Sequence, residues 1–217
     1  MADYLVKTTA EWDSQYRNGH WDYLKFKGER PHYSAVAECI HQHHHNGSIV
    51  DLGCGFGELW KYLYEDEKKK YTGIDYSAAA IKMAKQLQEN CFYLCDINDY
   101  IPSEKLEIIV INEVLYYIPR PLEMLNKVFH WLTRNGVVIL SLYIGPNKQT
   151  DYNTITNNII TGIKNRNDFI IYDESLVTSD TQPELQWNIY VIGIDRDVTA
   201  QCQRYTGMCT RRGNREQ

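Results

Sequence analysis

The chain has 217 residues, of which 43% are hydrophobic and 24% charged, as is typical of one soluble globular domain with a sizeable core. The net charge of -5 argues against a nucleic-acid-binding surface, which is normally basic. The apolar runs are too short to span a bilayer, and the first residues lack the basic and apolar regions of a secretory signal. We therefore expect a cytoplasmic protein without nucleic-acid or membrane partners.

Strand-like and helix-like segments alternate from Ser48 onward. Strands are predicted at residues 48–52, 71–75, 91–95, 107–112 and 137–143. Helices are predicted at residues 34–45, 58–67, 77–89 with Ser77 as N-cap, and from Pro121 through Leu132, where Asn135-Gly136 would stop the helix. This alternation predicts an α/β fold with a mainly parallel sheet and helices on both faces.

The C-terminal part breaks the alternation. Residues 169–177 and 186–194 both have the pattern of strands, and only a turn-rich stretch separates them. That gap is too short for a helical crossover, so we expect an antiparallel hairpin beside the parallel sheet. The all-parallel sheet of a dinucleotide-binding dehydrogenase has no such hairpin.

We divide the chain into three parts. Residues 1–47, rich in aromatic side chains, are expected to form a helical lid or substrate segment. Residues 48–195 are expected to form the ligand-binding core, in which residues 145–167 help the N-terminal segment to shape the substrate pocket. Residues 196–217 are polar and are expected to form a flexible tail.

Cysteines and histidines raise the question of a disulfide or a metal site. Without a secretory signal, the six cysteines are expected to be reduced thiols. Cys91 and Cys95 are four residues apart, but the segment between them reads as a strand and no second ligand pair follows. The histidine cluster at residues 41–45 precedes Asn46-Gly47, a favoured helix stop. We expect no metal and interpret the cluster as a polar helix end, with metal binding as the alternative.

The segment Asp51-Leu52-Gly53-Cys54-Gly55-Phe56-Gly57 lies at a predicted strand–turn–helix junction. Its glycines permit positive φ and let a ligand approach bare backbone. Asp75 ends the next strand, where a carboxylate can accept the hydroxyl hydrogens of a ribose. The dinucleotide fingerprint needs glycine or alanine at the position of Glu58, whose charge would repel a pyrophosphate. Acidic residues at these positions are compatible with a cationic ligand that has no phosphate. This favours S-adenosylmethionine over NAD.

Four segments resemble the motifs of class I S-adenosylmethionine-dependent methyltransferases. They are residues 49–57, 73–77, 95–97 and 111–118, in the order of that family. The resemblance implies a Rossmann-like, mainly parallel seven-stranded sheet with a terminal antiparallel hairpin. The aromatic residues at 11–22 loosely resemble the N-terminus of bacterial nodulation-type small-molecule N-methyltransferases.

The resemblance also implies roles for individual residues in binding S-adenosylmethionine. The methionine moiety would lie against Asp51, Gly53, Cys54, Gly55, Gly57 and Asn112. Asp75 would hold the ribose, Tyr76 would flank the adenine ring, and Asp96 and Ile97 would recognise its edge. Tyr16, Trp21 and Arg30 would belong to a lid, with core packing as the alternative for the aromatic residues.

Glu113 and Tyr117 follow the fourth strand, where the carboxyl ends of an open sheet face the ligand crevice. We expect them to orient the methyl acceptor or take its proton; alternatively, Glu113 caps the next turn and is structural. Acidic and aromatic residues favour an amine-bearing acceptor. The predicted function is N-methylation of a small molecule by a monomer or homodimer. The alternatives are O-methylation of a hydroxyl or carboxylate, an NAD-dependent oxidoreductase, and a non-catalytic S-adenosylmethionine-binding protein.

Overall fold

The structure, a computed structural model, describes residues 5–145 and 151–195. The tail that we predict to be flexible, residues 196–217, lies outside the described residues. The strands are β1 (Ile49–Leu52), β2 (Tyr71–Asp75), β3 (Phe92–Leu94), β4 (Leu106–Asn112), β5 (Leu132–Ile144), β6 (Phe169–Thr178) and β7 (Gln186–Ile194). The helices are α1 (Thr9–Arg17), α2 (Arg30–His43), α3 (Glu65–Lys68), α4 (Ala78–Ala84), α5 (Pro121–Phe129) and α6 (Asp151–Lys164).

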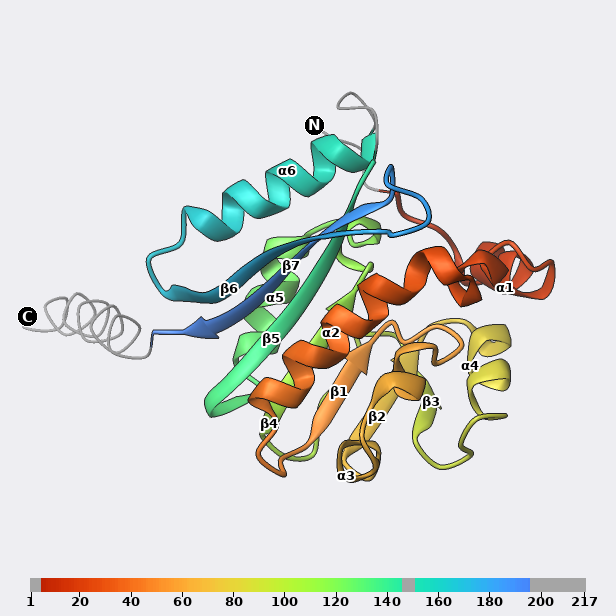
Figure 1. Cartoon of the computed structure of the whole chain (residues 1–217). Coiled ribbons are helices and arrows are strands. Elements are labelled where there is room, and N and C mark those ends of the chain that lie inside the picture. Colours follow the sequence, from red (N-terminus) through yellow and green to blue (C-terminus); the bar gives the residue numbers. More distant parts are fainter. Residues whose placement is uncertain (1–4, 146–150, 196–217) are drawn as a thin grey trace, which may run out of the picture.

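The seven strands form one sheet in the order β3-β2-β1-β4-β5-β7-β6 (Figure 1). Strands β1 to β5 pair in parallel, whereas β7 is antiparallel to both β5 and β6. This confirms the predicted α/β fold and its terminal hairpin. The chain starts in the middle at β1, runs outward to β3 and returns to β4 beside β1. Such a switch in strand order opens a crevice at the carboxyl ends of the strands, where open α/β sheets bind ligands.

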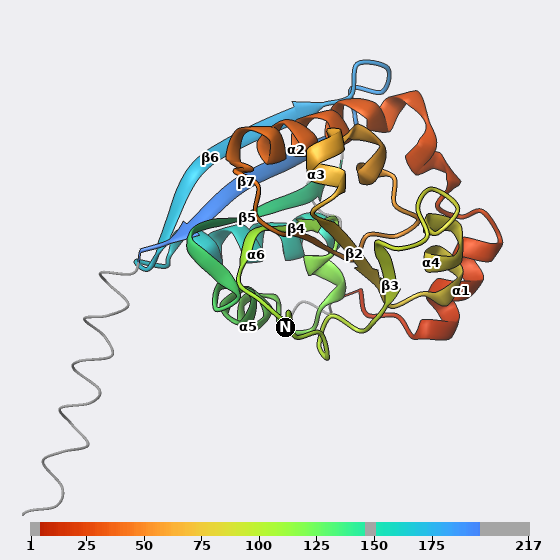
Figure 2. The same ribbon diagram turned by 90° about the horizontal axis from the view of Figure 1, so that it is seen from below.

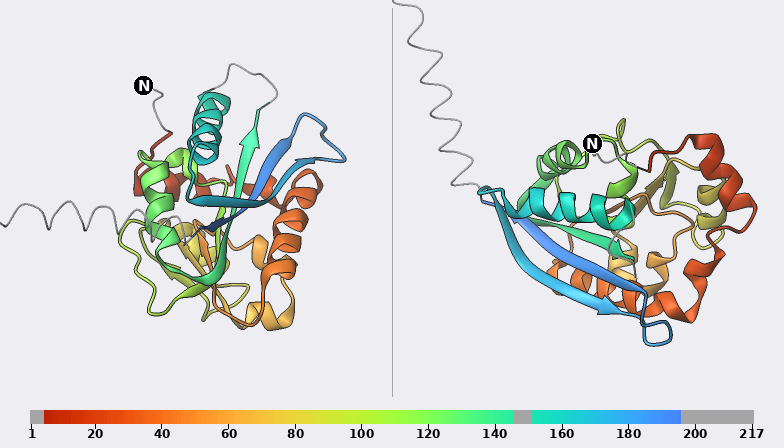
Figure 3. Two further views of the ribbon diagram at one scale, coloured as in Figure 1. Left: turned by 90° about the vertical axis from the view of Figure 1, so that its left-hand side faces the viewer. Right: turned by 90° about the horizontal axis from the view of Figure 1, so that it is seen from above.

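Helices cover both faces of the sheet, as predicted (Figure 2). On one face, side chains of α2 and α4 form a core with strand residues such as Ile49 and Ile108. On the other face, α5 and α6 pack against the alternating residues, such as Ile109 and Leu140. This two-sided burial explains why the central strands are continuous apolar runs. Figure 3 shows β6 and β7 at the outer edge of the sheet, beyond β5.

The predicted helix at residues 58–67 is wrong in its extent. The segment forms a 3-10 turn at Leu59–Tyr62 and then the short helix α3, with Leu63 extended between them. Leu63 leaves the helical conformation and is buried, only 4% exposed. The Glu67 carboxylate then accepts the Tyr64 amide at 2.7 Å and begins the new turn. Helix α4 is likewise shorter than predicted, although Ser77 is its N-cap and accepts the Ala80 amide at 3.1 Å.

The boundary between α5 and β5 also differs from the prediction. The helix ends at Phe129, and Leu132 already pairs with Leu106 of β4. Asn135 and Gly136 therefore lie inside β5, at a register shift, rather than at a helix end. A Cβ on Gly136 would lie 2.8 Å from the Leu106 carbonyl oxygen. The glycine is needed for a close approach of two backbones, which a local helix-stop pattern does not distinguish.

Two further helices differ from what we predicted. Helix α2 begins at Arg30, four residues before the predicted start, with Pro31 in its first turn. Helix α6 was not predicted, although Ile155, Ile159 and Ile163 recur at helical spacing and are buried. It packs against β5 on the face that also carries α5.

The histidine cluster lies at the C-terminal end of α2. His41 Nδ1 is 2.7 Å from Glu67 Oε1, and His43 Nδ1 is 3.0 Å from the Cys39 carbonyl oxygen. Within residues 5–145 and 151–195, no group of three or more His, Cys, Asp or Glu residues is placed to hold a metal ion. No helix in the same ranges is both long and apolar enough to cross a membrane.

Candidate cofactor and acceptor site

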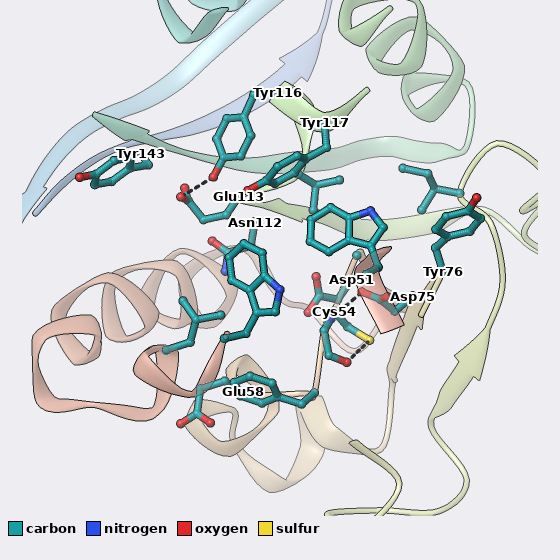
Figure 4. A pocket seen from close by; sticks show the side chains of 18 of the residues that line it. Asp51, Cys54, Glu58, Asp75, Tyr76, Asn112, Glu113, Tyr116, Tyr117 and Tyr143 are labelled. Carbon is teal, nitrogen blue, oxygen red and sulfur yellow. Dashed lines mark hydrogen bonds between the residues drawn. The ribbon is translucent and has the colours of Figure 1, made fainter. Parts of the chain in front are cut away.

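A cavity of about 610 Å³ opens at the carboxyl ends of β1, β2 and β4. The N-terminal segment around α1 lines its remaining side. Figure 4 shows Asp51, Cys54 and Asp75 gathered in one part of the cavity and Glu113, Tyr116 and Tyr143 in another, with Asn112 beside Glu113. The cavity therefore has two distinct ends, which we call the glycine-loop end and the Glu113 end.

The glycine loop is tied to the neighbouring strand by its backbone. The Gly53 and Cys54 amides donate to the Ile74 carbonyl oxygen at 2.8 and 2.9 Å. Gly53, Gly55 and Gly57 all have positive φ, at 80°, 56° and 80°. Gly53 and Gly55 line the cavity, but Gly57 does not: a Cβ there would lie 2.7 Å from the Phe92 ring. Gly57 thus serves the packing of the loop on β3.

Two carboxylates at this end are buried. Asp51 Oδ2 accepts a hydrogen bond from the Tyr71 hydroxyl at 2.7 Å, whereas Oδ1 is buried without a partner. Burial raises the pKa of Asp51 to about 7. Asp75 accepts the Gly55 and Ser77 amides at 2.9 and 2.8 Å, and burial raises its pKa to about 6. Both carboxylates would gain from a bound ligand with positive charge or hydroxyl donors.

The cavity extends past the carboxyl end of β3 to the other residues predicted for adenine recognition. Tyr76, Asp96 and Ile97 all line it. Asp96 Oδ1 accepts the backbone amide of Asn98 at 2.8 Å, which fixes the carboxylate in the turn after β3. The turn begins next to Asp75, whose carbonyl oxygen accepts the Cys95 amide at 2.9 Å, as expected for the carboxyl ends of adjacent parallel strands.

The N-terminal segment contributes more aromatic side chains than predicted. Tyr16 and Trp21 line the cavity, as do Trp12 and Lys7, which were not predicted. The Lys7 ammonium lies 4.6 Å from the Trp12 ring centroid and 4.7 Å from that of Tyr117. Arg30 is exposed and does not line the cavity.

Asp13 joins this segment to α4. Its Oδ1 accepts the Ser77 hydroxyl at 2.6 Å and the Ala79 amide at 3.1 Å. The N-terminal segment therefore supplies part of the cap of α4.

Glu113 stands at the other end of the cavity. It has φ of 61°, a rare conformation for a residue other than glycine. Its Oε2 accepts the Tyr116 hydroxyl at 2.6 Å and its Oε1 accepts the Ser141 hydroxyl at 3.1 Å. Burial raises the pKa of Glu113, although both hydrogen bonds lower it. The predicted partner Tyr117 lines the cavity and lies 3.0 Å, oxygen to oxygen, from Tyr152, and burial raises its pKa.

Several residues that line the Glu113 end were not predicted. Tyr143, Tyr152, Trp187 and the buried Glu29 line the cavity. Behind them, His32 is fully buried and stacks on Trp187 with ring centroids 4.7 Å apart. Within the described part of residues 145–167, Tyr152 lines the cavity. The sequence contains a signal for the start of α2, but none for the contacts that α2 makes with β4 and β5.

Acidic side chains outnumber basic ones along the cavity. Six carboxylates line it, from Glu29, Asp51, Glu58, Asp75, Asp96 and Glu113. Lys7 is the one lysine or arginine among the described lining residues. Such a cavity attracts a cationic ligand and opposes an anionic one.

A protein-family model described as a methyltransferase domain matches residues 43–166. Trans-aconitate 2-methyltransferase of Escherichia coli O7:K1 is 30% identical over 96 residues, 43% of this chain and 38% of that protein. The enzyme of the same name from Azoarcus sp. strain BH72 is 26% identical over 133 residues, 60% of this chain and 50% of that protein. The chain thus matches half or less of the length of these curated relatives.

Two solved structures have a similar fold. The N-methyltransferase NodS from Bradyrhizobium japonicum WM9, in complex with S-adenosyl-L-homocysteine, has a TM-score of 0.67 at 16% identity, covering 86% of this chain and 98% of that one. Magnesium protoporphyrin IX methyltransferase from Synechocystis PCC 6803, with bound S-adenosylmethionine, has a TM-score of 0.56 at 15% identity, covering 88% and 99%. Together with the family model, which covers more than half of the chain, they show that it belongs to the methyltransferase-domain family and has the class I, Rossmann-like fold.

Proposed function

We propose that the chain transfers the methyl group of S-adenosylmethionine to an amine nitrogen of a small molecule. The observation that carries the proposal is the charge of the cavity: carboxylates line both ends, and Lys7 is the one lysine or arginine among the described lining residues. Both the sulfonium donor and a protonated amine are cations, so the same cavity attracts both.

The glycine-loop end fits S-adenosylmethionine. Asp51 Oδ1, buried without a partner, suits the ammonium group of the methionine moiety. Asp75 retains lone pairs for ribose hydroxyls, and Gly53 and Gly55 leave the backbone open to close approach. When bound, S-adenosylmethionine supplies a methyl group that its sulfonium already activates. The side chains therefore have mainly to align and enclose the reactants.

Alignment is a large part of such a reaction, because well-oriented pairs reach effective molarities of about 10⁵ M or more. Tyr117, Tyr143 and Tyr152 would hold the acceptor against Glu113 and exclude water. We propose that residues 1–47 act as a lid, since Trp12, Tyr16 and Trp21 line the cavity from the N-terminal side. We further propose a cytoplasmic monomer or homodimer.

O-methylation of a carboxylate is the second candidate, and the similarity to trans-aconitate 2-methyltransferases favours it. A carboxylate acceptor would need a cationic partner in the cavity, and Lys7 is the one that the described lining offers. Against it stand Glu29 and Glu113, which would repel a carboxylate at the Glu113 end. An NAD-dependent reaction is disfavoured because Glu58 lines the cavity beside the glycine loop.

A radiolabelled methyl-transfer assay tests these candidates directly. The purified chain is incubated with methyl-labelled S-adenosylmethionine and panels of primary amines, secondary amines, hydroxy compounds and carboxylates that include trans-aconitate. We expect label in amines, and calorimetric binding of S-adenosylhomocysteine but not of NAD. Label in trans-aconitate alone would replace N-methylation by O-methylation. Binding of S-adenosylhomocysteine without any labelled product would indicate a non-catalytic protein.

A further inference from the structure

The imidazole of His32 lies behind the Glu113 end and is held from several sides. Its Nε2 is 2.8 Å from Asn112 Oδ1 and 2.9 Å from Ser141 Oγ. Ser141 donates its own hydrogen to Glu113, so its oxygen accepts from the ring. Asn112 Oδ1 is also an acceptor. Nε2 therefore carries the hydrogen of the neutral ring.

The other nitrogen, Nδ1, then has a lone pair and no hydrogen. It is buried and has no hydrogen-bond partner in the described part of the chain. The carboxylate oxygen Oε2 of Glu29 lies 3.7 Å away. Glu29 precedes His32 by three residues, is only 5% exposed, and lines the cavity. A buried lone pair beside a carboxylate gains a partner when a proton binds between them.

We propose that Glu29 and His32 form the proton-accepting pair of the acceptor site. Glu29 contacts the ammonium group of the acceptor and is the catalytic residue. His32 is the positioning residue that holds the proton on Nδ1. The proposal rests on the amine acceptor of the proposed function and deepens it.

Glu29 suits this role better than Glu113 does. Both oxygens of Glu113 already accept hydroxyl hydrogens, from Tyr116 and Ser141. In the described structure no hydroxyl donates a hydrogen bond to Glu29. The polar neighbour of its carboxylate is His32 Nδ1, which presents a lone pair. Glu113 is linked to His32 through Ser141, and its negative charge then stabilises the imidazolium that forms.

The proton transfers balance as follows. The protonated amine gives one proton to the Glu29 carboxylate, which passes it to Nδ1 of neutral His32. The lone pair freed on the amine forms the new nitrogen–carbon bond as the carbon–sulfur bond breaks, and that bond's electrons stay on sulfur. The methylated product keeps one positive charge. His32 returns its proton to solvent through Glu29 after the product leaves.

The ionisable groups that face His32 are Glu29 on its own side, Glu113 through Ser141, and Tyr33, whose ring centroid is 5.0 Å away. Each of the three is either neutral or negatively charged, so none of them opposes a positive charge on His32. The stack on Trp187, nearly parallel at 4°, keeps the ring in the plane that points Nδ1 at Glu29.

Nitrogen NMR of the histidine-labelled full chain, without any ligand, tests the pair. The signal missing from His32→Gln assigns His32 among the seven histidines. At high pH we expect the Nε2–H tautomer. In Glu29→Gln the Nδ1 resonance of His32 should shift, because the new side-chain amide can donate a hydrogen bond to the Nδ1 lone pair and the carboxylate cannot. Glu58→Gln is the matched control, since Glu58 also lines the cavity but pairs with Lys61 at 2.6 Å. An Nδ1–H tautomer, or an unchanged Nδ1 resonance in Glu29→Gln, would overturn the pair.

Methyl transfer to an amine from the panel supplies the second readout. Glu29→Gln should lower kcat/KM about 10²-fold at pH 7, the scale of general base catalysis, and less at pH 9, where more amine arrives neutral. Glu29→Asp should recover part of the loss, and S-adenosylhomocysteine affinity should not change. An equal loss at both pH values would contradict a proton-accepting role. If no amine is methylated, the proposed function fails, while the NMR result still decides whether the pair exists.

Discussion

The Tyr71 hydroxyl donates a 2.7 Å hydrogen bond to Oδ2 of Asp51, while Oδ1 of the same carboxylate is buried and has no partner. The fold thus supplies a hydrogen bond to Oδ2, whereas Oδ1 remains available to a ligand. Burial without full compensation explains why the pKa of Asp51 rises to about 7. The site is built for binding at the expense of stability in the ligand-free protein.

Replacing this carboxylate should stabilise the ligand-free protein. The folded-state pKa of about 7 lies above the ordinary value of 3.8, so the native state binds the proton more tightly than the unfolded state does. The stabilising contribution of the protonated form is present below pH 3.8 and is lost as pH rises through about 7. Asp51→Asn should therefore raise the free energy of unfolding by about 2–4 kcal/mol at pH 8 and by less at pH 5.

Urea denaturation at both pH values measures this difference. Asp96→Asn, which alters a less buried carboxylate of the same cavity, is the control. Equal effects of Asp51→Asn at pH 5 and pH 8 would show that its charge does not destabilise the fold. The variant should also bind S-adenosylhomocysteine more weakly than the wild type.

Affinity for S-adenosylhomocysteine should rise with pH. In the proposed complex the ammonium and ribose groups pair with ionised Asp51 and Asp75, whose pKa values in the free protein are raised to about 7 and about 6. Binding favours the ionised forms, so protons are released when the complex forms at pH 6. Calorimetry in two buffers of different ionisation enthalpy should show this release, with affinity increasing about tenfold or more from pH 5.5 to 8.

Asp75→Asn removes one of these ionisations without removing the side chain. It should weaken S-adenosylhomocysteine binding by about 1.5–3 kcal/mol, the scale of hydrogen bonds to charged groups. It should also flatten the pH dependence. An unchanged dissociation constant would remove Asp75 from the ribose site.

Glu113→Gln should lower turnover more than cofactor affinity. Glu113 lies away from the glycine-loop end and accepts hydrogen bonds from Tyr116 and Ser141 (Figure 4). The neutral amide keeps the shape of the side chain but removes a negative charge from the Glu113 end of the cavity. Steady-state kinetics and S-adenosylhomocysteine titration measure the two effects separately. Tyr116→Phe, which removes one hydrogen bond and leaves the carboxylate, should have the smaller effect on turnover. Wild-type behaviour in both measurements would make Glu113 a structural residue.

Gly55→Ala should destabilise the fold and weaken ligand binding together. Gly55 has φ of 56°, and a Cβ there would lie 2.8 Å from the Tyr16 hydroxyl. The left-handed conformation alone costs about 1–2 kcal/mol for a residue with a side chain. Tyr16→Phe removes the clashing oxygen, so the double variant should recover part of the binding loss but not the backbone cost. Strict additivity of the two changes in a double-mutant cycle would show that Tyr16 and Gly55 do not interact.

Much of the sheet could be predicted because its signals are local. The bounds of β2 and β7 agree with the prediction to the residue, since apolar runs there end at clear turn signals. Once the strand order of the family is assumed, residues after each strand gather at one edge. That is why Asp51, Asp75, Asp96 and Glu113 line one cavity.

The features that were missed depend on contacts between distant segments. His32 meets Asn112 and Ser141, which are 80 and 109 residues away in the sequence. Glu29 and Arg30 are neighbours, yet the start of α2 buries the first and exposes the second. The family resemblance assigned Arg30 to the lid, but the sequence does not show which way each of these side chains points. In the same way, Gly136 resembled a helix stop because the Leu106 carbonyl that it approaches belongs to another strand.

The shared cap of α4 has a kinetic consequence. The Ala79 amide donates to Asp13, which belongs to the N-terminal segment, whereas the Ala80 amide donates to Ser77 of the helix's own cap. If the N-terminal segment is the lid that we propose, each opening removes the acceptor of the Ala79 amide and lets its hydrogen exchange with water, while that of Ala80 stays protected. The ratio of the two exchange rates therefore reports how often the cavity opens. A ligand that holds the segment down should slow the Ala79 exchange selectively.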